Sequence, residues 1–359
     1  MALNKKLFVN GGGGGLVPSA NFTPVLYSGN STARNIPVGF KPDLVWIKNR
    51  NNSDNSTHDH RLFDSVRSSG FSVKSNSPLQ EEDKTAWFSG ISSNGFGLTN
   101  ALPLNDGTTN GTYVAWCWKF GGKENTFNKD GVGFSSASAA GLTAGTTAPS
   151  ASSVNTVAGH SMVKVTTASG SNKTVPHGLG VKPDLIIWKR LDAQEEGWTF
   201  TDVISGADDN NGYLILNSTA ARANASEAAP TTTVVSQPTT GVKTYVVYMF
   251  ASIAGFSKIG SYTGNNSLTG NVIDCGFEPS WVMIKQASGS GTRWVILDNK
   301  RNTSNRRNTF IFADGAFAEG TEGSLSLNFT SIGFQYSSTT GAVNASMNAG
   351  VTYLFYAIA

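Results

Sequence analysis

The chain has 359 residues, of which 39% are hydrophobic and 14% are charged. Its 27 lysines and arginines against 24 acids give a net charge of +3, and these charges are scattered, which argues against an extended nucleic-acid-binding surface. With 40 glycines and few charges, the composition favours a turn-rich, all-β chain of about two or three domains.

The N-terminal segment, residues 1–21, is expected to be an anchoring arm. Its apolar stretch, Leu7 to Val9, is far shorter than the roughly 7 to 15 apolar residues of a signal peptide, so no export is expected. Five consecutive glycines follow at 11–15 and lack the lysine and helix of a phosphate-binding loop, so they predict a flexible hinge. No stretch reaches the ~18 consecutive apolar residues of a membrane helix, and no membrane insertion is expected.

One strand pattern then occurs three times along the chain. A proline is followed within a few positions by an apolar run that closes on a lysine, and such a run without alternation indicates a strand buried on both faces. A second strand ends on an aspartate, and each copy closes on an apolar strand that begins with Thr-Tyr. The prolines are Pro42, Pro183 and Pro279, the lysines Lys48, Lys189 and Lys285, the aspartates Asp64, Asp202 and Asp298, and the threonines Thr112, Thr244 and Thr352.

These copies predict an all-β fold of three tandem β-sandwich repeats with a short N-terminal arm. The repeats span 22–121, 159–254 and 255–359, and each has the ~100 residues usual for a β-sandwich. The second and third share a short junction and are expected to pack as a rigid pair. Between the first and second, residues 122–158 are rich in Ser, Ala, Gly and Thr, which predicts an extended linker or a strap over a neighbour.

The ordered motifs resemble a repeat found in tailed-bacteriophage virion proteins of the tail-fibre-like kind. The motifs are PDLVWIKNR from Pro42, LFDSVR from Leu62, YVAWCWK from Tyr113, YTGN from Tyr262 and TYLFYA from Thr352, and the resemblance covers residues 22–359. It implies a virion component made in the cytoplasm of a bacterial host. The expected partners are other virion proteins, reached through the N-terminal arm, a host-surface glycan or receptor, and further copies of the chain, with a trimer favoured.

Three functions remain open at this point. The first is a tail or neck fibre-like protein that contacts the host surface, and the second is a capsid or tail decoration or adaptor protein that binds only virion proteins. The third, a glycan-cleaving tail spike, needs two facing carboxylates and is disfavoured. The aspartates at the strand ends recur in all three copies, which fits turns that build the fold. In that interpretation Asp64 pairs with Arg67, and Asp298 with Arg301. No enzyme activity and no cofactor are predicted.

One stretch of the sequence contains residue types that bind metal ions. His58 and His60 could supply two ligands, with Asp54 or Asp64 as a third. The other copies have no equivalent, and the surrounding loop, 49–60, has the composition of a solvated segment. No metal is therefore predicted.

Candidate contact residues lie where the copies differ. The tryptophans within the recurring strands are expected in the core, as are Cys117 and Cys275 as free thiols, and Trp198 and Trp294 are intermediate. Trp87, in a variable excursion, is the candidate exposed aromatic residue. In the third copy, four cations could bind anionic sugars, phosphates or a partner's carboxylates through bidentate hydrogen bonds, or could form a solvated turn. These four cations are Lys300, Arg301, Arg306 and Arg307. The tryptophans expected in the core are Trp46, Trp116, Trp118, Trp188 and Trp281.

Overall fold

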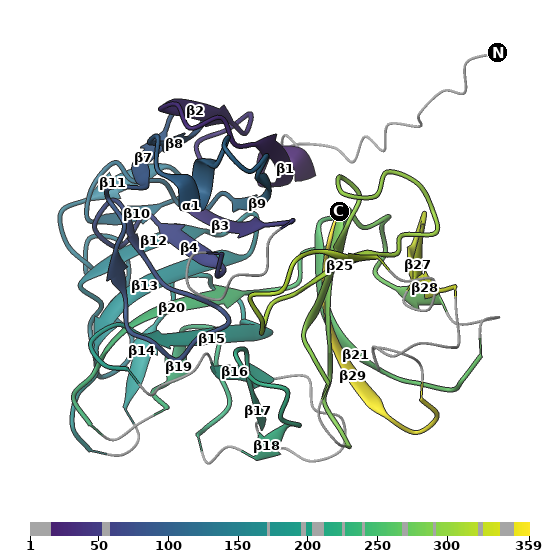
Figure 1. Ribbon diagram of the computed structural model, residues 1–359. Coiled ribbons are helices and arrows are strands. Elements are labelled where there is room, and N and C mark those ends of the chain that lie inside the picture. Colours follow the sequence, from purple (N-terminus) through teal and green to yellow (C-terminus); the bar gives the residue numbers. More distant parts are fainter. Residues whose placement is uncertain are drawn as a thin grey trace.

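The fold is all-β, as predicted (Figure 1). The computed structural model describes residues 16–51, 58–170, 173–194, 199–202, 212–224, 227–238, 241–267, 272–289, 292–321, 326–337 and 348–359, and it describes only the backbone of 199–202. Most of the predicted arm, the middle of the 49–60 loop with Asp54, and Trp198 lie outside these residues. No described helix is long and apolar enough to cross a membrane.

The first repeat pairs a four-stranded sheet with a smaller one. The larger sheet has the order β1 (Phe22–Ser28), β9 (Thr112–Trp118), β3 (Leu44–Asn49), β4 (Arg61–Asp64). The smaller has the order β2 (Arg34–Pro37), β8 (Gly95–Leu98), β7 (Phe88–Ser92). Short elements complete it: η1 (Pro18–Ala20), the β5 (Phe71–Ser72) and β6 (Glu82–Asp83) pair, and α1 (Leu102–Asn105).

The second repeat has a longer sheet that includes the segment predicted as a linker. Its order is β11 (Val132–Phe134), β10 (Phe127–Lys129), β12 (Ala151–Asn155), β13 (His160–Thr166), β20 (Thr244–Phe250), β15 (Leu185–Arg190), β16 (Thr199–Asp202), β17 (Gly212–Ile215), β18 (Ala223–Asn224). A two-stranded sheet pairs β14 (Thr174–Pro176) with β19 (Val234–Ser236). The sequence left open whether the 122–158 segment is an extended linker or a strap over a neighbour. Its strand β12 is fully buried beside β13, so the segment packs on the second repeat.

The third repeat returns to the arrangement of the first. Its larger sheet has the order β21 (Ser257–Thr263), β29 (Thr352–Ile358), β23 (Trp281–Gln286), β24 (Val295–Asp298), β25 (Thr309–Phe312), β26 (Gly320–Thr321). Its smaller sheet has the order β22 (Val272–Asp274), β28 (Gly333–Tyr336), β27 (Leu327–Thr330). In all three large sheets, the Thr-Tyr strand lies between an opening strand and the strand after the recurring proline.

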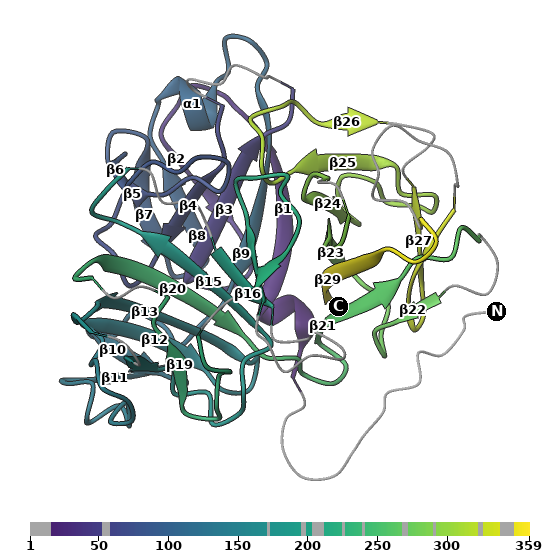
Figure 2. The same cartoon turned by 90° about the horizontal axis from the view of Figure 1, so that it is seen from below.

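The three large sheets face one another around a shared apolar core (Figures 1 and 2). Leu44 and Trp46 of β3 point into this shared core, whereas Val45 and Ile47 point into the first repeat's own sandwich. Strands β15 and β23 alternate in the same way. Because successive side chains of a strand point to opposite faces, a strand between two cores needs apolar residues at every position. This explains the unbroken apolar runs.

The repeats are closed into a ring by three related backbone hydrogen bonds. Glu319 N–H of the third repeat donates to Arg50 O of the first at 2.6 Å. The first repeat donates to the second through Glu81 N–H and Leu191 O at 3.3 Å, and the second donates to the third through Arg222 N–H and Ala287 O at 2.9 Å. Each repeat therefore contacts both others, in a cyclic head-to-tail arrangement within one chain.

The recurring aspartates build turns, as predicted for the two with described side chains. Asp64 Oδ1 accepts the backbone N–H groups of Val66 and Arg67, and Oδ2 accepts Arg67 Nε at 2.7 Å. Asp298 forms the same turn, with Arg301 Nε 2.6 Å from Oδ2. These buried carboxylates have their hydrogen-bonding capacity used within the protein. The side chain of Asp202 lies outside the described part of the chain.

Candidate functional site

Two of the four predicted contact cations are part of the packed structure. Arg301 is buried, with its side chain bound to Asp298 and Ile296 O and its guanidinium 5.6 Å from the centre of the Trp116 ring. Arg307 is buried as well, with its guanidinium 4.5 Å from the centre of the Phe329 ring. The prediction that they form an exposed contact site is wrong, because neighbouring segments cover both side chains.

The other predicted contact residues keep some exposure. Lys300 and Arg306 are exposed, whereas Arg301 and Arg307, their neighbours in the chain, are buried. Trp87 is half-buried: the Arg61 guanidinium lies 5.1 Å and the Lys84 ammonium 4.3 Å from its ring centre. Cations on the indole use much of the surface that a ligand would need.

His60 is held inside the protein. Trp46 Nε1 donates to His60 Nδ1 at 2.8 Å, so the proton of the neutral ring lies on Nε2, which donates to Phe312 O at 2.9 Å. Burial lowers its pKa well below the ordinary histidine value. Both ring nitrogens are used, and the described residues contain no group of three His, Cys, Asp or Glu side chains arranged to hold a metal ion.

The core predictions are confirmed. All five strand tryptophans are buried, four of them in the shared core and Trp188 in the second repeat's sandwich. Trp294, which the sequence left intermediate, is buried in the shared core too. Cys117 and Cys275 are buried free thiols, and burial raises the pKa of Cys275 to about 12.

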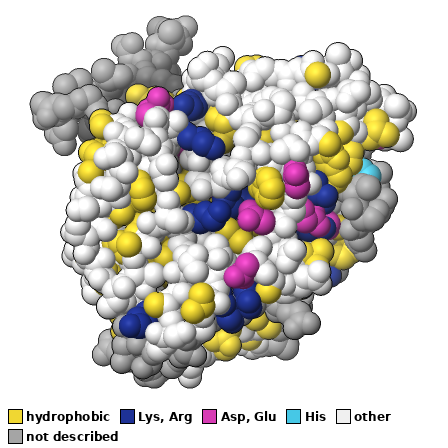
Figure 3. Space-filling model, turned by 90° about the vertical axis from the view of Figure 1, so that its left-hand side faces the viewer, with side chains coloured by type: hydrophobic (Ala, Val, Ile, Leu, Met, Phe, Trp, Pro, Cys, Tyr) yellow, Lys and Arg dark blue, Asp and Glu magenta, His cyan; other side chains and the backbone are white. Residues whose placement is uncertain are grey.

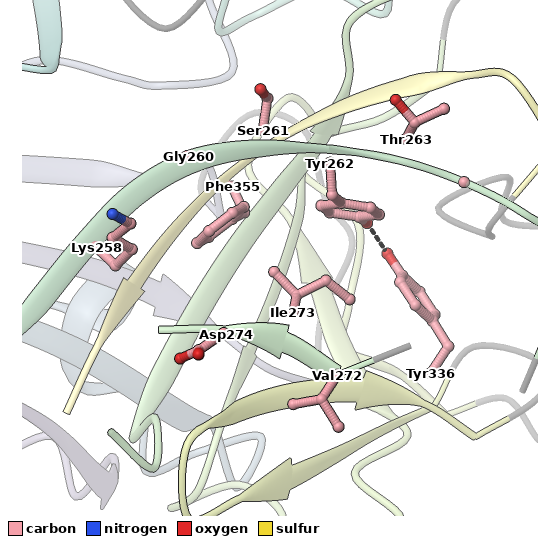
Figure 4. Close-up of a pocket in the computed structure, with 11 residues that line it drawn as sticks. Lys258, Gly260, Ser261, Tyr262, Thr263, Val272, Ile273, Asp274, Tyr336 and Phe355 are labelled. Carbon is pink, nitrogen blue, oxygen red and sulfur yellow. Dashed lines mark hydrogen bonds between the residues drawn. The ribbon is translucent and has the colours of Figure 1, made fainter. Parts of the chain in front are cut away.

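A pocket that the sequence did not indicate opens between the two sheets of the third repeat (Figure 4). It has a volume of about 350 Å³, which falls in the range of small-ligand pockets. The ring of Tyr262 and the ring of Phe355 lie along β21 and β29, and Ile273 of β22 faces them (Figure 4). Lys258 and Asp274 are its exposed charged residues, so the pocket has an aromatic wall and a polar rim.

The aromatic wall is held rigidly. Tyr262 stacks on Tyr353 with ring centres 5.2 Å apart and planes inclined by 14°, and its hydroxyl is hydrogen-bonded to that of Tyr336. Burial raises the pKa of Tyr262 and of Tyr336, so both phenols stay neutral at physiological pH. A fixed, uncharged aromatic face costs little conformational entropy when a ligand packs on it.

A small-to-large exchange shapes this pocket. Gly260 and Phe355 are cross-strand partners, and a Cβ atom on Gly260 would lie 2.8 Å from two atoms of the Phe355 ring. Val25 and Ala115 form the equivalent pair in the first repeat. In the first repeat the larger side chain of this pair is on the edge strand β1, whereas in the third repeat it is on β29, the strand next to the edge strand β21. This exchange is the signal that an alignment of the repeats would have contained.

The equivalent gap of the first repeat is spanned by a side chain. Arg34 lies with its guanidinium 5.7 Å from the centre of the Tyr27 ring, and it donates to Ser28 O and, at 3.1 Å, to Asn105 Oδ1. Tyr27 corresponds to Tyr262 and stacks on Tyr113 with ring centres 4.9 Å apart. The same aromatic stack thus carries an arginine in the first repeat, whereas in the third repeat it lines the pocket.

A family model matches residues 17–359 of the chain. The chain belongs to the DUF7483 family. This model is described as a domain of unknown function, and it spans all three repeats of the fold. No curated protein matches the sequence. Any function of this DUF7483 chain must therefore be argued from its own residues.

The DUF7483 pocket combines aromatic rings with a polar rim. Asp274 is the one carboxylate among the described residues that line it, whereas glycoside hydrolysis needs two carboxyl groups on either side of the bond. Aromatic rings with a few polar groups at the rim suit a ligand with an apolar face and hydroxyl edges. A saccharide unit has this character.

Proposed function

We propose that this protein is a structural component of a tailed-phage virion, a tail or neck fibre-like protein that contacts the host surface. The resemblance of its repeat motifs to tail-fibre-like virion proteins supports the proposal. The observation that carries host contact is the pocket of Tyr262 and Phe355, which offers an uncharged aromatic face and a polar rim to a surface saccharide. In this proposal the pocket binds the glycan without cleaving it.

The proposed assembly follows the same resemblance. The N-terminal arm joins the protein to other virion proteins, and three chains associate around the fibre axis. The second candidate is a decoration or adaptor protein that binds only virion proteins. The large buried core and the small number of exposed candidate contact residues are compatible with this role as well.

Adsorption of the labelled full-length protein to host cells tests the proposal. Binding should fall after periodate oxidation of the cell-surface glycans. Val272→Trp places a bulky ring at the exposed pocket rim and should reduce binding, while Ile332→Trp, at an exposed position that does not line the pocket, should leave it unchanged. Density or antibody label on the particle without any adsorption of the protein to cells would favour the adaptor instead.

A further inference from the structure

A second hollow lies at the seam between the first and second repeats. It has a volume of about 650 Å³ and is lined by the turn after β4 and by the segment around β10 and β12. Figure 3 shows the side of the molecule on which β10 and β11 lie, where lysine and arginine side chains near the middle of the face lie among aspartate and glutamate side chains. This hollow is separate from the aromatic pocket of the third repeat, with which it shares no residue.

The charged groups of the hollow all have the same sign. Three cations and no carboxylate are among the described residues that line it, and the rest of the lining is mostly hydroxyl or amide side chains. The cations are Arg67, Lys123 and Lys164; the polar lining residues are Ser65, Ser68, Asn125, Thr126 and Ser150.

Nearby acids do not neutralise the two lysines. Glu124, next to Lys123 in the chain, is paired instead with Lys41 at 2.9 Å. Glu81 lies 3.5 Å from Arg67 Nη1, and Asp64 is bound to Arg67 Nε. Lys123 Nζ donates to Arg67 O at 3.3 Å, which holds it at the hollow while leaving its other two N–H groups for a ligand.

The Arg67 guanidinium lies behind the lysines and is used within the protein. It is fully buried, its Nε is bound to Asp64, its Nη2 donates to Leu62 O, and its Nη1 forms an ion pair with Glu81. Lys164 comes from β13 and Lys123 from the segment before β10, so the two ammonium groups reach the hollow from segments far apart in the sequence. Packing of the 122–158 segment onto β13 is what brings them together.

We propose that this hollow is an anion-binding site for a phosphate or carboxylate group, as carried by acidic surface polysaccharides. Lysine ammonium groups and hydroxyls are donors, and charge-assisted hydrogen bonds to an oxyanion are the strong interactions that such a set makes. The site would add recognition of charge to the aromatic pocket's recognition of a sugar face. It does not depend on the proposed virion role.

Chemical-shift titration of the ¹⁵N-labelled full-length chain tests the site. Sodium phosphate and sodium glucuronate are added in separate titrations, with sodium chloride at matched ionic strength and neutral glucose as references. Saturable shifts of the Ser68, Thr126 and Ser150 amides are expected with at least one of the two anions. If only phosphate or only glucuronate gives saturable shifts, that anion identifies the group that the site binds. If neither anion gives saturable shifts, the proposal is wrong.

Variants separate binding at the hollow from general attraction of anions. Lys123→Gln with Lys164→Gln should weaken binding at least about tenfold, because two charge-assisted hydrogen bonds are lost. Lys182→Gln, at an exposed position of the second repeat outside the hollow, should leave the Kd unchanged. An unchanged melting temperature of the double variant shows that it folds, and unchanged affinity in that variant overturns the site whatever the adsorption to cells.

Discussion

Trp116 of the first repeat donates a hydrogen bond from Nε1 to Asp298 Oδ2 of the third repeat at 3.0 Å. Tyr248, at the equivalent position of the second repeat, donates to Asp64 Oδ2 of the first at 2.6 Å. Each of these aspartates also forms the local turn with its arginine. The same carboxylate therefore fixes a turn within one repeat and the seam to the next.

We expect Trp116→Phe to lower the free energy of unfolding by about 1–3 kcal/mol more than Trp281→Phe does. Both changes remove an indole from the shared core, but Trp281 Nε1 has no hydrogen-bond partner among the described atoms. The difference thus reports the bond to the buried Asp298 carboxylate together with the contact of Arg301 on the Trp116 ring. Urea unfolding of the two variants measures it, and equal losses would mean that the bond across the seam adds no stability.

The Gly260 and Phe355 pair should behave as a coupled unit. Gly260→Val alone should destabilise the protein by about 1–3 kcal/mol, because the new side chain overlaps the Phe355 ring. Adding Phe355→Ala recreates the Val and Ala pair of the first repeat and should recover part of that loss. A double-mutant cycle from urea unfolding measures the coupling. Strictly additive changes in the free energy of unfolding would show that the two positions are not coupled.

The two neighbouring arginines of the third repeat should respond differently to serine. Arg307→Ser should lower the free energy of unfolding by about 1–3 kcal/mol, because it removes the buried stem and the guanidinium over the Phe329 ring. Arg306→Ser, at an exposed position, should stay within about 0.5 kcal/mol. Melting temperatures of the single variants decide this, and two equally small shifts would argue against the buried placement of Arg307.

The buried histidines should make the protein less stable in acid. Burial lowers the pKa of His160 to about 4, so between pH 6.5 and 4 the unfolded chain binds a proton that the native state does not. This contribution is fully present above about pH 6.5 and is lost as the pH falls toward 4.

His160→Phe removes that titrating group and introduces the residue found at the equivalent position 22 of the first repeat. Its stability should fall less steeply with acid than that of the parent, by up to about 3 kcal/mol between pH 7 and pH 4. Urea unfolding at several pH values measures both slopes. Burial also lowers the pKa of His177 to about 4, and His177 remains in both proteins. If the stability of the variant and of the parent falls equally with acid, His160 does not contribute to the acid sensitivity.

The sequence by itself determined the features that depend on nearby residues. The unbroken apolar run from Leu44 to Ile47 predicted a strand buried on both faces, and the strand lies between two cores. Asp298 and Arg301, three positions apart, predicted a local pair, and they form one. Such patterns can be interpreted because strand alternation and turn geometry act over a few residues.

Only the tertiary structure decided which surfaces remained exposed. Arg301 belongs to a stretch of polar composition, yet the Trp116 ring, supplied by a strand 182 residues away from Asp298, covers it. Gly260 and Phe355 meet only when β21 pairs with β29, and Lys123 meets Lys164 only when the 122–158 segment joins β13. Burial and pocket formation depend on contacts between residues that are distant in the chain, and the local sequence does not encode which repeat will face which.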